Sequence, residues 1–329
     1  MLARRAVTST LLVLSLAACA ERQGTRSNYK DSKSFPGAPG KLVVLDVRSL
    51  DAEIEVVAGG SIDVAVELAA RSSSRAAARR WVERNTPVLE DSPSRLEIGT
   101  PRRGSVSVIG FIETEGVLRV KVPAECKLEV RTASGDVSVR GESPMAAPVR
   151  IETTSGDIVV RGGARELVLE TSSGDVRVTG SALALLEADT ASGDITLDAG
   201  ADRVVVDTAS GEAVLRNLRG DLSVTSTSGD VDARWLRLAP GTRVNVETSS
   251  GEVTLRLVSG VPITGEVRSS NGRIESEFSG EEDRRGRRFT LSAGGTANEA
   301  TPGAATGSAV LSVRTGSGDV SLLETSPVI

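Results

Sequence analysis

A short motif of Thr or Ser, any residue, Ser, Gly and Asp recurs along most of this chain, as in "ETSSGDVRVTG" at residues 170–180. Variants of the motif place its glycine at nine positions: Gly135, Gly156, Gly174, Gly193, Gly211, Gly229, Gly251, Gly272 and Gly318. Most intervals are 18–22 residues, and the last interval, of 46 residues, is about two periods. A catalytic motif is normally needed once, whereas a unit repeated at a nearly constant interval predicts a repeat architecture.

Apolar and polar positions alternate on both sides of the motif glycine. In the quoted unit, Leu167 and Leu169 precede the glycine and Val176 and Val178 follow it, each pair at alternate positions. Alternation with a period of two predicts strands that bury one face. We expect a second turn six residues after the glycine, because Gly and Asn tolerate the positive φ of tight turns. Its candidate positions are Gly141, Gly162, Gly180 and, later, Asn217.

These features predict an all-β fold and, within it, a β-solenoid with coils of about 18–22 residues. Stacked coils place like residues in ladders, and we expect the Thr and Ser hydroxyls three positions before each glycine to hydrogen-bond along the stack. A soluble antiparallel β-meander is the alternative architecture. A membrane barrel fits less well, because its strands need about 9–11 residues.

The first residues have the pattern of an export signal. Arg4 and Arg5 precede a short apolar segment, and "LAAC" then ends at Cys19. The apolar segment is too short to span a membrane, so this pattern predicts a signal peptide at residues 1–18. The motif resembles the bacterial lipobox, which implies a diacylglycerol and an acyl lipid such as palmitate on Cys19; no other cofactor is expected. The polar residues 19–40 lack periodicity and predict a flexible tether.

The residue after the cysteine and the net charge indicate a location and exclude one class of partner. Ala20 is not Asp, which by resemblance to enterobacterial sorting signals implies an outer-membrane lipoprotein, at the periplasmic face or the cell surface. After cleavage 37 basic and 44 acidic residues remain, a net charge of −7. Nucleic acid is therefore not an expected partner. The expected partners are the membrane, through the lipid anchor, and an envelope protein, a glycan or further copies of the chain.

The pattern divides the remaining chain into two regions. Residues 41–125 are interpreted as an N-terminal β region, and residues 126–329 as the repeat solenoid that continues it. Cys126, at the junction, is expected to be a small buried residue at the start of a strand. With Cys19 acylated, no intramolecular disulfide is expected.

One segment has the pattern of a helix. Residues 72–85, "SSSRAAARRWVERN", carry serines that can cap its N-terminus, and Ala78, Trp81 and Val82 share one face. We expect the helix to cap an open end of the solenoid, where strand edges would otherwise be unpaired.

The chain contains no histidine, which removes the common nucleophile–histidine systems and histidine-based zinc sites. The acidic position after each glycine provides weak candidates for a metal site, at Asp136, Asp157, Asp175 and Asp194. Capping of turn N–H groups is the favoured role for these carboxylates, because Glu and Arg also occupy the position. No coil departs from the others to build a catalytic carboxylate pair, and we expect no enzyme activity.

Contact sites are expected where the repetition breaks. Trp235, at the second turn of its repeat, is one candidate, although packing in the core is the favoured role for it. The insertion at residues 279–306 contains "EEDRRGRR", which is interpreted as a solvated loop or a charged contact. Its candidate contact residues are Arg284, Arg285, Arg287 and Arg288.

The serial units, preceded by "VLRVKVPAECKLEVRTASGDVSV" at residues 117–139, resemble the bacterial "putative adhesin" family, a domain of unknown function related to toastrack β-solenoids of envelope proteins. The resemblance covers residues 41–325 and implies a solenoid scaffold at the cell envelope with an adhesive or assembly role. It implies no catalytic residues. Our first hypothesis is therefore a non-enzymatic envelope lipoprotein that binds another envelope component. The alternatives are a carbohydrate-active enzyme on a β-helix and a scaffold for envelope-stress sensing or regulation.

Overall fold

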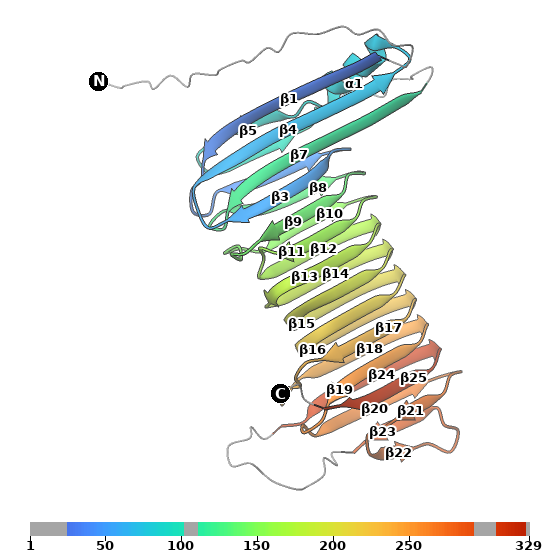
Figure 1. Cartoon of the computed structure of the whole chain (residues 1–329). Coiled ribbons are helices and arrows are strands. Elements are labelled where there is room, and N and C mark those ends of the chain that lie inside the picture. Colours follow the sequence, from blue (N-terminus) through green and yellow to red (C-terminus); the bar gives the residue numbers. More distant parts are fainter. Residues whose placement is uncertain (1–24, 102–110, 293–306, 327–329) are drawn as a thin grey trace.

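A computed structural model describes residues 25–101, 111–292 and 307–326. In these residues the fold is all-β with one helix, and the strands stack in a long, solenoid-like array (Figure 1). Successive repeat strands pair in parallel and belong to two layers, whose apolar faces meet in one continuous core. Parallel pairing between coils excludes the antiparallel meander for the repeat region.

Each layer can be followed by its hydrogen-bonded neighbours from the N-terminal end of the array. One layer, which we call layer A, contains in order β5 (Val88–Asp91), β6 (Arg95–Gly99), β2 (Leu42–Val47), β8 (Lys127–Thr132), β10 (Val149–Thr153), β12 (Glu166–Ser173), β14 (Leu185–Ser192), the second halves of β15 (Ile195–Ser210) and β16 (Ala213–Ser228), β18 (Arg243–Ser250), β24 (Ala309–Ser317), β20 (Ile263–Ser269), β23 (Arg288–Leu291) and β22 (Gly280–Glu282).

The other layer, layer B, carries the strands that follow each motif glycine. It contains in order β1 (Thr25–Pro36), β4 (Ser61–Ser72), β7 (Ile112–Pro123), β3 (Asp51–Val57), β9 (Val137–Gly141), β11 (Ile158–Gly162), β13 (Val176–Leu183), the first halves of β15 and β16, β17 (Val231–Trp235), β19 (Val253–Val258), β25 (Val320–Thr325) and β21 (Ile274–Ser276).

The register confirms the predicted columns. Leu167 pairs with Val149 on one side and with Leu186 on the other, and Val176 pairs with Ile158 and Ile195. These side chains are almost completely buried, as alternation requires. The positive φ predicted for the second turn is confirmed at Gly162, Gly180 and Asn217, but not at Gly141.

The motif glycine is required by the close approach of successive coils. A Cβ atom on Gly174 would overlap the backbone carbonyl of Gly156, and the same relation repeats from Gly135 along the stack. Glycine leaves room for this approach because it carries no side chain. The motif therefore marks the contact between coils as well as the turn.

The buried hydroxyl ladder differs from the expectation. Thr and Ser do align three positions before each glycine. However, within the described residues five of these buried hydroxyls have no hydrogen-bond partner: Thr153, Thr171, Thr190, Ser226 and Thr315. Others bond elsewhere than to the next hydroxyl; Thr208 and Thr248, for example, donate to the carbonyls of Ser210 and Ser250. The hydroxyls are packed in a column and do not form a hydrogen-bonded chain.

The coils at the two ends are not stacked in sequence order. Strand β24 lies between β18 and β20, so the last coil of the chain is inserted between two coils that precede it. In the same way β25 lies between β19 and β21. At the other end, β2 lies between β6 and β8. The long interval before Gly318 therefore contains strands β22 and β23, which lie beyond β20 at the end of the array, and β24, which lies on the other side of β20.

The predicted tether is wrong over residues 25–36, which form strand β1. This strand pairs antiparallel with β4, which pairs antiparallel with β7. Only Tyr29 and Phe35 supply large apolar side chains to its inner face. The period-two signal is consequently too weak to separate an edge strand from a polar linker.

Helix α1 spans Arg75–Asn85, with Ser74 as its N-cap. It begins three residues later than predicted, because Ser72 is still part of β4. Its buried residues Ala77, Ala78 and Val82 pack towards β4 and β1. The helix thus covers the inner face of these strands at the N-terminal end rather than their free edge (Figure 1).

Candidate functional site

The outer face of layer B is hollowed at its N-terminal end. A groove of about 620 Å³ crosses strands β1, β4, β7, β3 and β9. Small residues, among them Ser32, Ala65 and Ser138, lie between long charged side chains along this face. The groove therefore results from a change in side-chain size on a surface that is otherwise built from regular strands.

The charged side chains of the groove are brought together by strand register. Arg119 on β7 faces Glu53 on β3, and Lys121 faces Glu55. On the next strand Arg140 faces Glu55 as well. Opposite charges on directly opposed strands stabilise a sheet, so the pairing and the charge pattern are consistent with one another.

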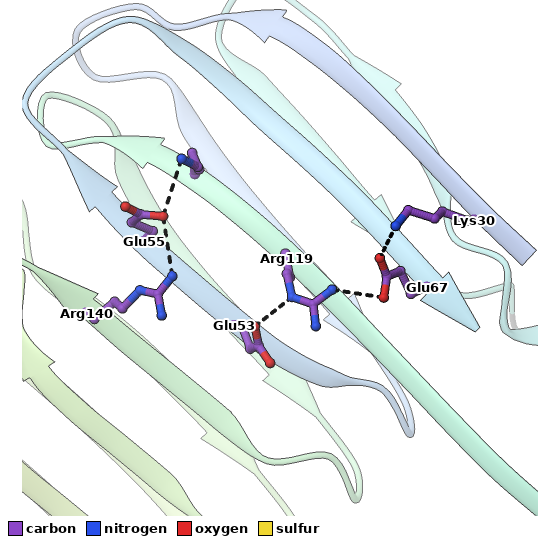
Figure 2. Close-up of polar contacts among 7 residues, drawn as sticks. Lys30, Glu53, Glu55, Glu67, Arg119 and Arg140 are labelled. Carbon is purple, nitrogen blue, oxygen red and sulfur yellow. Dashed lines mark hydrogen bonds and ion pairs between the residues drawn. The ribbon is translucent and has the colours of Figure 1, made fainter. Parts of the chain in front are cut away.

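A chain of ion pairs runs across four strands (Figure 2). Lys30 Nζ lies 2.5 Å from Glu67 Oε1, and Arg119 contacts both Glu67 Oε2, at 3.1 Å, and Glu53 Oε2, at 2.8 Å. Glu55 Oε2 is 3.5 Å from both Lys121 Nζ and Arg140 Nη2. Arg119 is the centre of this network, because it joins the carboxylates of two strands.

Hydrogen bonding favours the ionised form of two carboxylates on this face, Glu67 and Asp63. Bonds from Lys30 and Arg119 lower the pKa of Glu67. Bonds from the hydroxyls of Ser34 and Ser61 lower the pKa of Asp63. Conversely, bonds to Glu67 and Glu53 raise the pKa of Arg119. A general acid needs a raised pKa at neutral pH, whereas the pKa values of Glu67 and Asp63 are lowered.

The acidic column after the motif glycine forms a second regular array. Oδ1 of Asp136 accepts the backbone N–H of Asp157, and Asp157 and Asp175 do the same for the acid that follows in the next coil. Oδ1 of Asp194 accepts the N–H of Glu212. These four residues were the metal candidates. In the part of the chain that the structure describes, no group of three or more His, Cys, Asp or Glu side chains is arranged to hold a metal ion.

Trp235 is not a surface contact. It is 1% exposed, and its Nε1 donates to the carbonyl of Gly220 at 3.0 Å. Trp235 is in register with the buried Leu218 of the preceding coil, so the larger indole continues a core position. Burial of the ring with its N–H paired is the usual arrangement for tryptophan.

The arginine-rich segment is a β-hairpin at the C-terminal end of the array, formed by β22 and β23 beside β20. Oδ1 of Asp283 accepts the backbone N–H groups of Arg285, Arg287 and Arg288, and these bonds lower the pKa of Asp283. Arg288 pairs with Glu266. The side chains of Arg284, Arg285 and Arg287 are exposed. The remainder of the insertion, residues 293–306, lies outside the described residues.

Two predicted features of the N-terminal part have different outcomes. Cys19 lies outside the described residues, and no helix within them is long and apolar enough to cross a membrane. Cys126 is confirmed as a buried free thiol directly before β8, and burial raises its pKa. An inert structural role follows for this cysteine, because reactivity needs the thiolate.

A family profile matches residues 45–323, a range that contains all the Ser-Gly-Asp repeats. The chain belongs to the Toastrack DUF4097 family. The matched range includes strands β3, β4 and β7 and helix α1 as well as the Ser-Gly-Asp repeats. None of the curated proteins compared with this toastrack chain matches it.

Several solved structures are similar to this toastrack protein. A "putative adhesin" from Bacteroides fragilis NCTC 9343 is 9% identical, with a TM-score of 0.42, and the match covers 90% of this chain and 97% of that one. A "putative adhesin" from Parabacteroides distasonis ATCC 8503 is 14% identical, with a TM-score of 0.42 and the same coverage. A "putative lipid binding protein" from the same organism is 15% identical, with a TM-score of 0.44, covering 69% of this chain and 89% of that one.

Sequence reasoning did not find the groove. Its charged residues are in strands that are far apart in the chain, such as Asp63, Arg119 and Arg140. Lys30 was assigned to the tether, which removed one side of the network. The sequence does show charged residues at the outward positions of these strands, as in "EIEV" and "VLRVKV". This pattern does not indicate which strands are neighbours, because the register of the strands is not known from the sequence.

Proposed function

We propose that this toastrack protein is a non-enzymatic cell-envelope lipoprotein that binds another envelope component through the groove on layer B. The groove is the observation that carries the proposal. The coils offer nearly the same surface in every repeat, whereas the groove is hollow and contains a charged network. Binding energy depends more on such shaped, convergent sites than on total surface area.

The chemistry of the groove favours a polar partner. Its cations and carboxylates alternate across the strands, and small hydroxyl and methyl side chains lie between them. A partner with charged or hydroxyl groups, such as a polypeptide segment or a glycan, can bind to side chains that are now paired with one another. Each of the partly exposed ion pairs that opens is then replaced by a contact with the partner. These pairs cost little to open, because exposed ion pairs contribute only about 0–1 kcal/mol each.

The carboxylates also favour binding over catalysis. Glu67 and Asp63 have lowered pKa values, and cations pair with Glu53 and Glu55. Glycoside hydrolysis requires one carboxylic acid with a raised pKa beside an ionised partner. A carbohydrate-active enzyme is therefore the less favoured function, and regulation of envelope stress is a role that the same binding site would serve.

Cross-linking in the native cells tests the groove. A photo-reactive amino acid is placed at Ser32 or Ser138 in the groove, and at Thr196 or Thr254, which occupy the outward row of layer B in later coils. Defined cross-links from the first pair and none from the second support the proposal. Equal cross-linking from all four positions, or none from the groove, would refute it.

The lipid anchor has its own test. Cells are fed a palmitate analogue that can be labelled, and the chain is compared with its Cys19→Ser variant. Label on the parent chain, absent from the variant, and recovery of the parent chain in the outer-membrane fraction support the proposed location. An unlabelled parent chain in the soluble fraction would exclude it.

A further inference from the structure

The N-terminal end of the array combines features that the rest of the surface lacks. Strand β1 begins at Thr25, opposite Ser72 on β4, and Ser72 is in turn opposite Ile112 on β7. Helix α1 starts just after Ser72, with its N-cap at Ser74. One row of the sheet thus brings together the start of the described chain, the start of the helix and the start of β7.

The solvent half of α1 is basic. Arg75, Arg79 and Arg80 are exposed and Arg84 is half-buried, whereas Glu83 is the one acidic residue of the helix. Arg79 pairs with Glu83 at 2.7 Å. Among the described residues no carboxylate pairs with the other three, and Arg80 donates only to the carbonyl of Ala76, at 3.1 Å. The helix therefore presents three uncompensated positive charges.

An exposed aromatic side chain lies at the same end. Phe111 is 51% exposed, and its carbonyl accepts the hydroxyl of Ser72 at 2.9 Å. The backbone N–H of Ser74 donates to the same Ser72 hydroxyl at 3.3 Å. Phe111 is thereby held beside the N-terminus of the basic helix. Arginines next to an exposed aromatic ring are the combination that binds the interface of an anionic bilayer.

The position of the chain in front of this end indicates the occupant. Five residues separate Cys19 from Thr25, and such a segment reaches at most about 20 Å when fully extended. We infer that the face formed by Arg75, Arg80, Arg84 and Phe111, here called the basic end, contacts the anionic lipid surface of the membrane that holds the chain. The lipid anchor that it assumes is part of the proposed function.

The charge on the coils explains why this contact would set the orientation of the protein. Stacked acids occupy the outer face of layer A, where Glu152, Glu170, Asp189 and Asp207 follow one another in register. An anionic surface repels this face and attracts the basic end, and both effects act within about 8–10 Å at physiological salt. The array then stands on its N-terminal end, with the β22–β23 hairpin far from the membrane (Figure 1).

Vesicle sedimentation tests the inference without the lipid anchor. The probe is the chain from residue 20 onwards, which keeps every described residue, mixed with vesicles of phosphatidylcholine or of an equal mixture with phosphatidylglycerol. The first variant is Arg75→Gln/Arg80→Gln/Arg84→Gln, which leaves the Arg79–Glu83 pair intact. The matched control, Arg284→Gln/Arg285→Gln/Arg287→Gln, removes the same charge from the opposite end.

We expect the parent chain and the control to bind the anionic vesicles and not the neutral ones. Each arginine near such a surface contributes roughly fivefold to partitioning, so the helix variant should bind at least tenfold more weakly. Binding should also weaken as NaCl rises from about 50 to about 500 mM. Phe111→Ser should weaken binding at either salt concentration, and it provides a second variant if the triple substitution lowers the thermal midpoint.

Three results would overturn the inference: no binding of the parent chain to anionic vesicles, unchanged binding of both basic-end variants, or an equal loss in the matched control. These results are independent of the anchor, because the probe lacks Cys19. Failure of palmitate labelling would instead refute the proposed lipoprotein and leave the vesicle result standing.

Discussion

Oδ1 of Asp157 accepts the backbone N–H of Asp175 at 2.9 Å, although the two residues belong to different coils. The bond explains why the position after the motif glycine is usually Asp. It also accounts for the exception at Arg273, whose N–H bonds to Asp319. The strand that follows Arg273, β21, is the last of layer B among the described residues, so no N–H of a further layer B strand there needs a carboxylate. The repeated acid is thus a hydrogen-bond acceptor between coils.

Loss of this acceptor should destabilise the stack. Asp175→Ala leaves the N–H of Asp194 without its acceptor, and we expect a decrease of about 1–2 kcal/mol in the free energy of unfolding. Chemical denaturation measures the change. Glu212 accepts no N–H from the next coil in the described residues, so Glu212→Ala should be nearly neutral. Equal losses in both variants would contradict the account.

The unpartnered hydroxyls offer a test with the opposite sign. The hydroxyl of Thr171 is buried without a partner among the described residues, so Thr171→Val should raise the free energy of unfolding by about 1 kcal/mol. The hydroxyl of Thr208 donates to Ser210, so Thr208→Val should be neutral or destabilising. The same denaturation experiment compares them. Destabilisation by Thr171→Val would mean that its hydroxyl is hydrogen-bonded.

The inserted coil makes the C-terminus essential. A chain that ends at residue 308 lacks β24 and β25, which lie between other coils, and therefore exposes the edges of β18 and β20. We expect rapid proteolysis after residue 240 and aggregation, because open strand edges pair with other chains. A chain that ends at residue 326 is the control. Monomeric, protease-resistant protein from the shorter chain would contradict the observed order of coils.

The stacked acids of layer A predict a dependence on pH. Burial raises the pKa of Asp189, and the charges of Asp207 and Glu187 add to this effect. The folded state therefore binds the proton more tightly than the unfolded state, so the site stabilises the fold at low pH and loses this contribution as pH rises through the raised pKa.

Asp189→Asn should consequently raise the free energy of unfolding at pH 7 by a few tenths of a kcal/mol, since like charges face each other across strands. The gain should vanish well below the ordinary aspartate pKa of about 3.9. Asp232 is paired with Arg256, so Asp232→Asn should not raise stability at pH 7. Thermal unfolding across pH measures both variants, and a gain for Asp189→Asn that persists in acid would be inconsistent with this cause.

The repeat architecture could be predicted because each coil carries its own pattern. The apolar columns depend on local alternation, the motif glycine on close approach and the second turn on residues that tolerate positive φ. Leu167, Gly174 and Gly180 are examples of the three features. Stacking like columns then leaves few choices of register, because a slip by one residue would expose every apolar side chain.

The ends of the array could not be predicted in this way. Strand β24 lies between β18 and β20, so the order of the coils differs from their order in the sequence. Neighbouring coils have nearly the same apolar columns, so the sequence pattern does not indicate this order. Strand β1 places only Tyr29 and Phe35 as large apolar side chains against the core, so its sequence is similar to that of a linker. The groove depends on strand β1, since Ser32 of β1 lines it beside Ala65 of β4 and Arg119 of the antiparallel β7.

The central claim is that the coils are the scaffold and the N-terminal groove is the binding site. Deletion of residues 176–194 removes one repeat of 19 residues and places Ile195 at the register position of Val176. The most direct measurement is the yield of cross-links from Ser138 in native cells, compared between the parent chain, this deletion and Arg119→Glu. The account predicts an unchanged yield for the deletion and loss of the cross-link for Arg119→Glu. Loss in the deletion together with an unchanged yield for Arg119→Glu would contradict it.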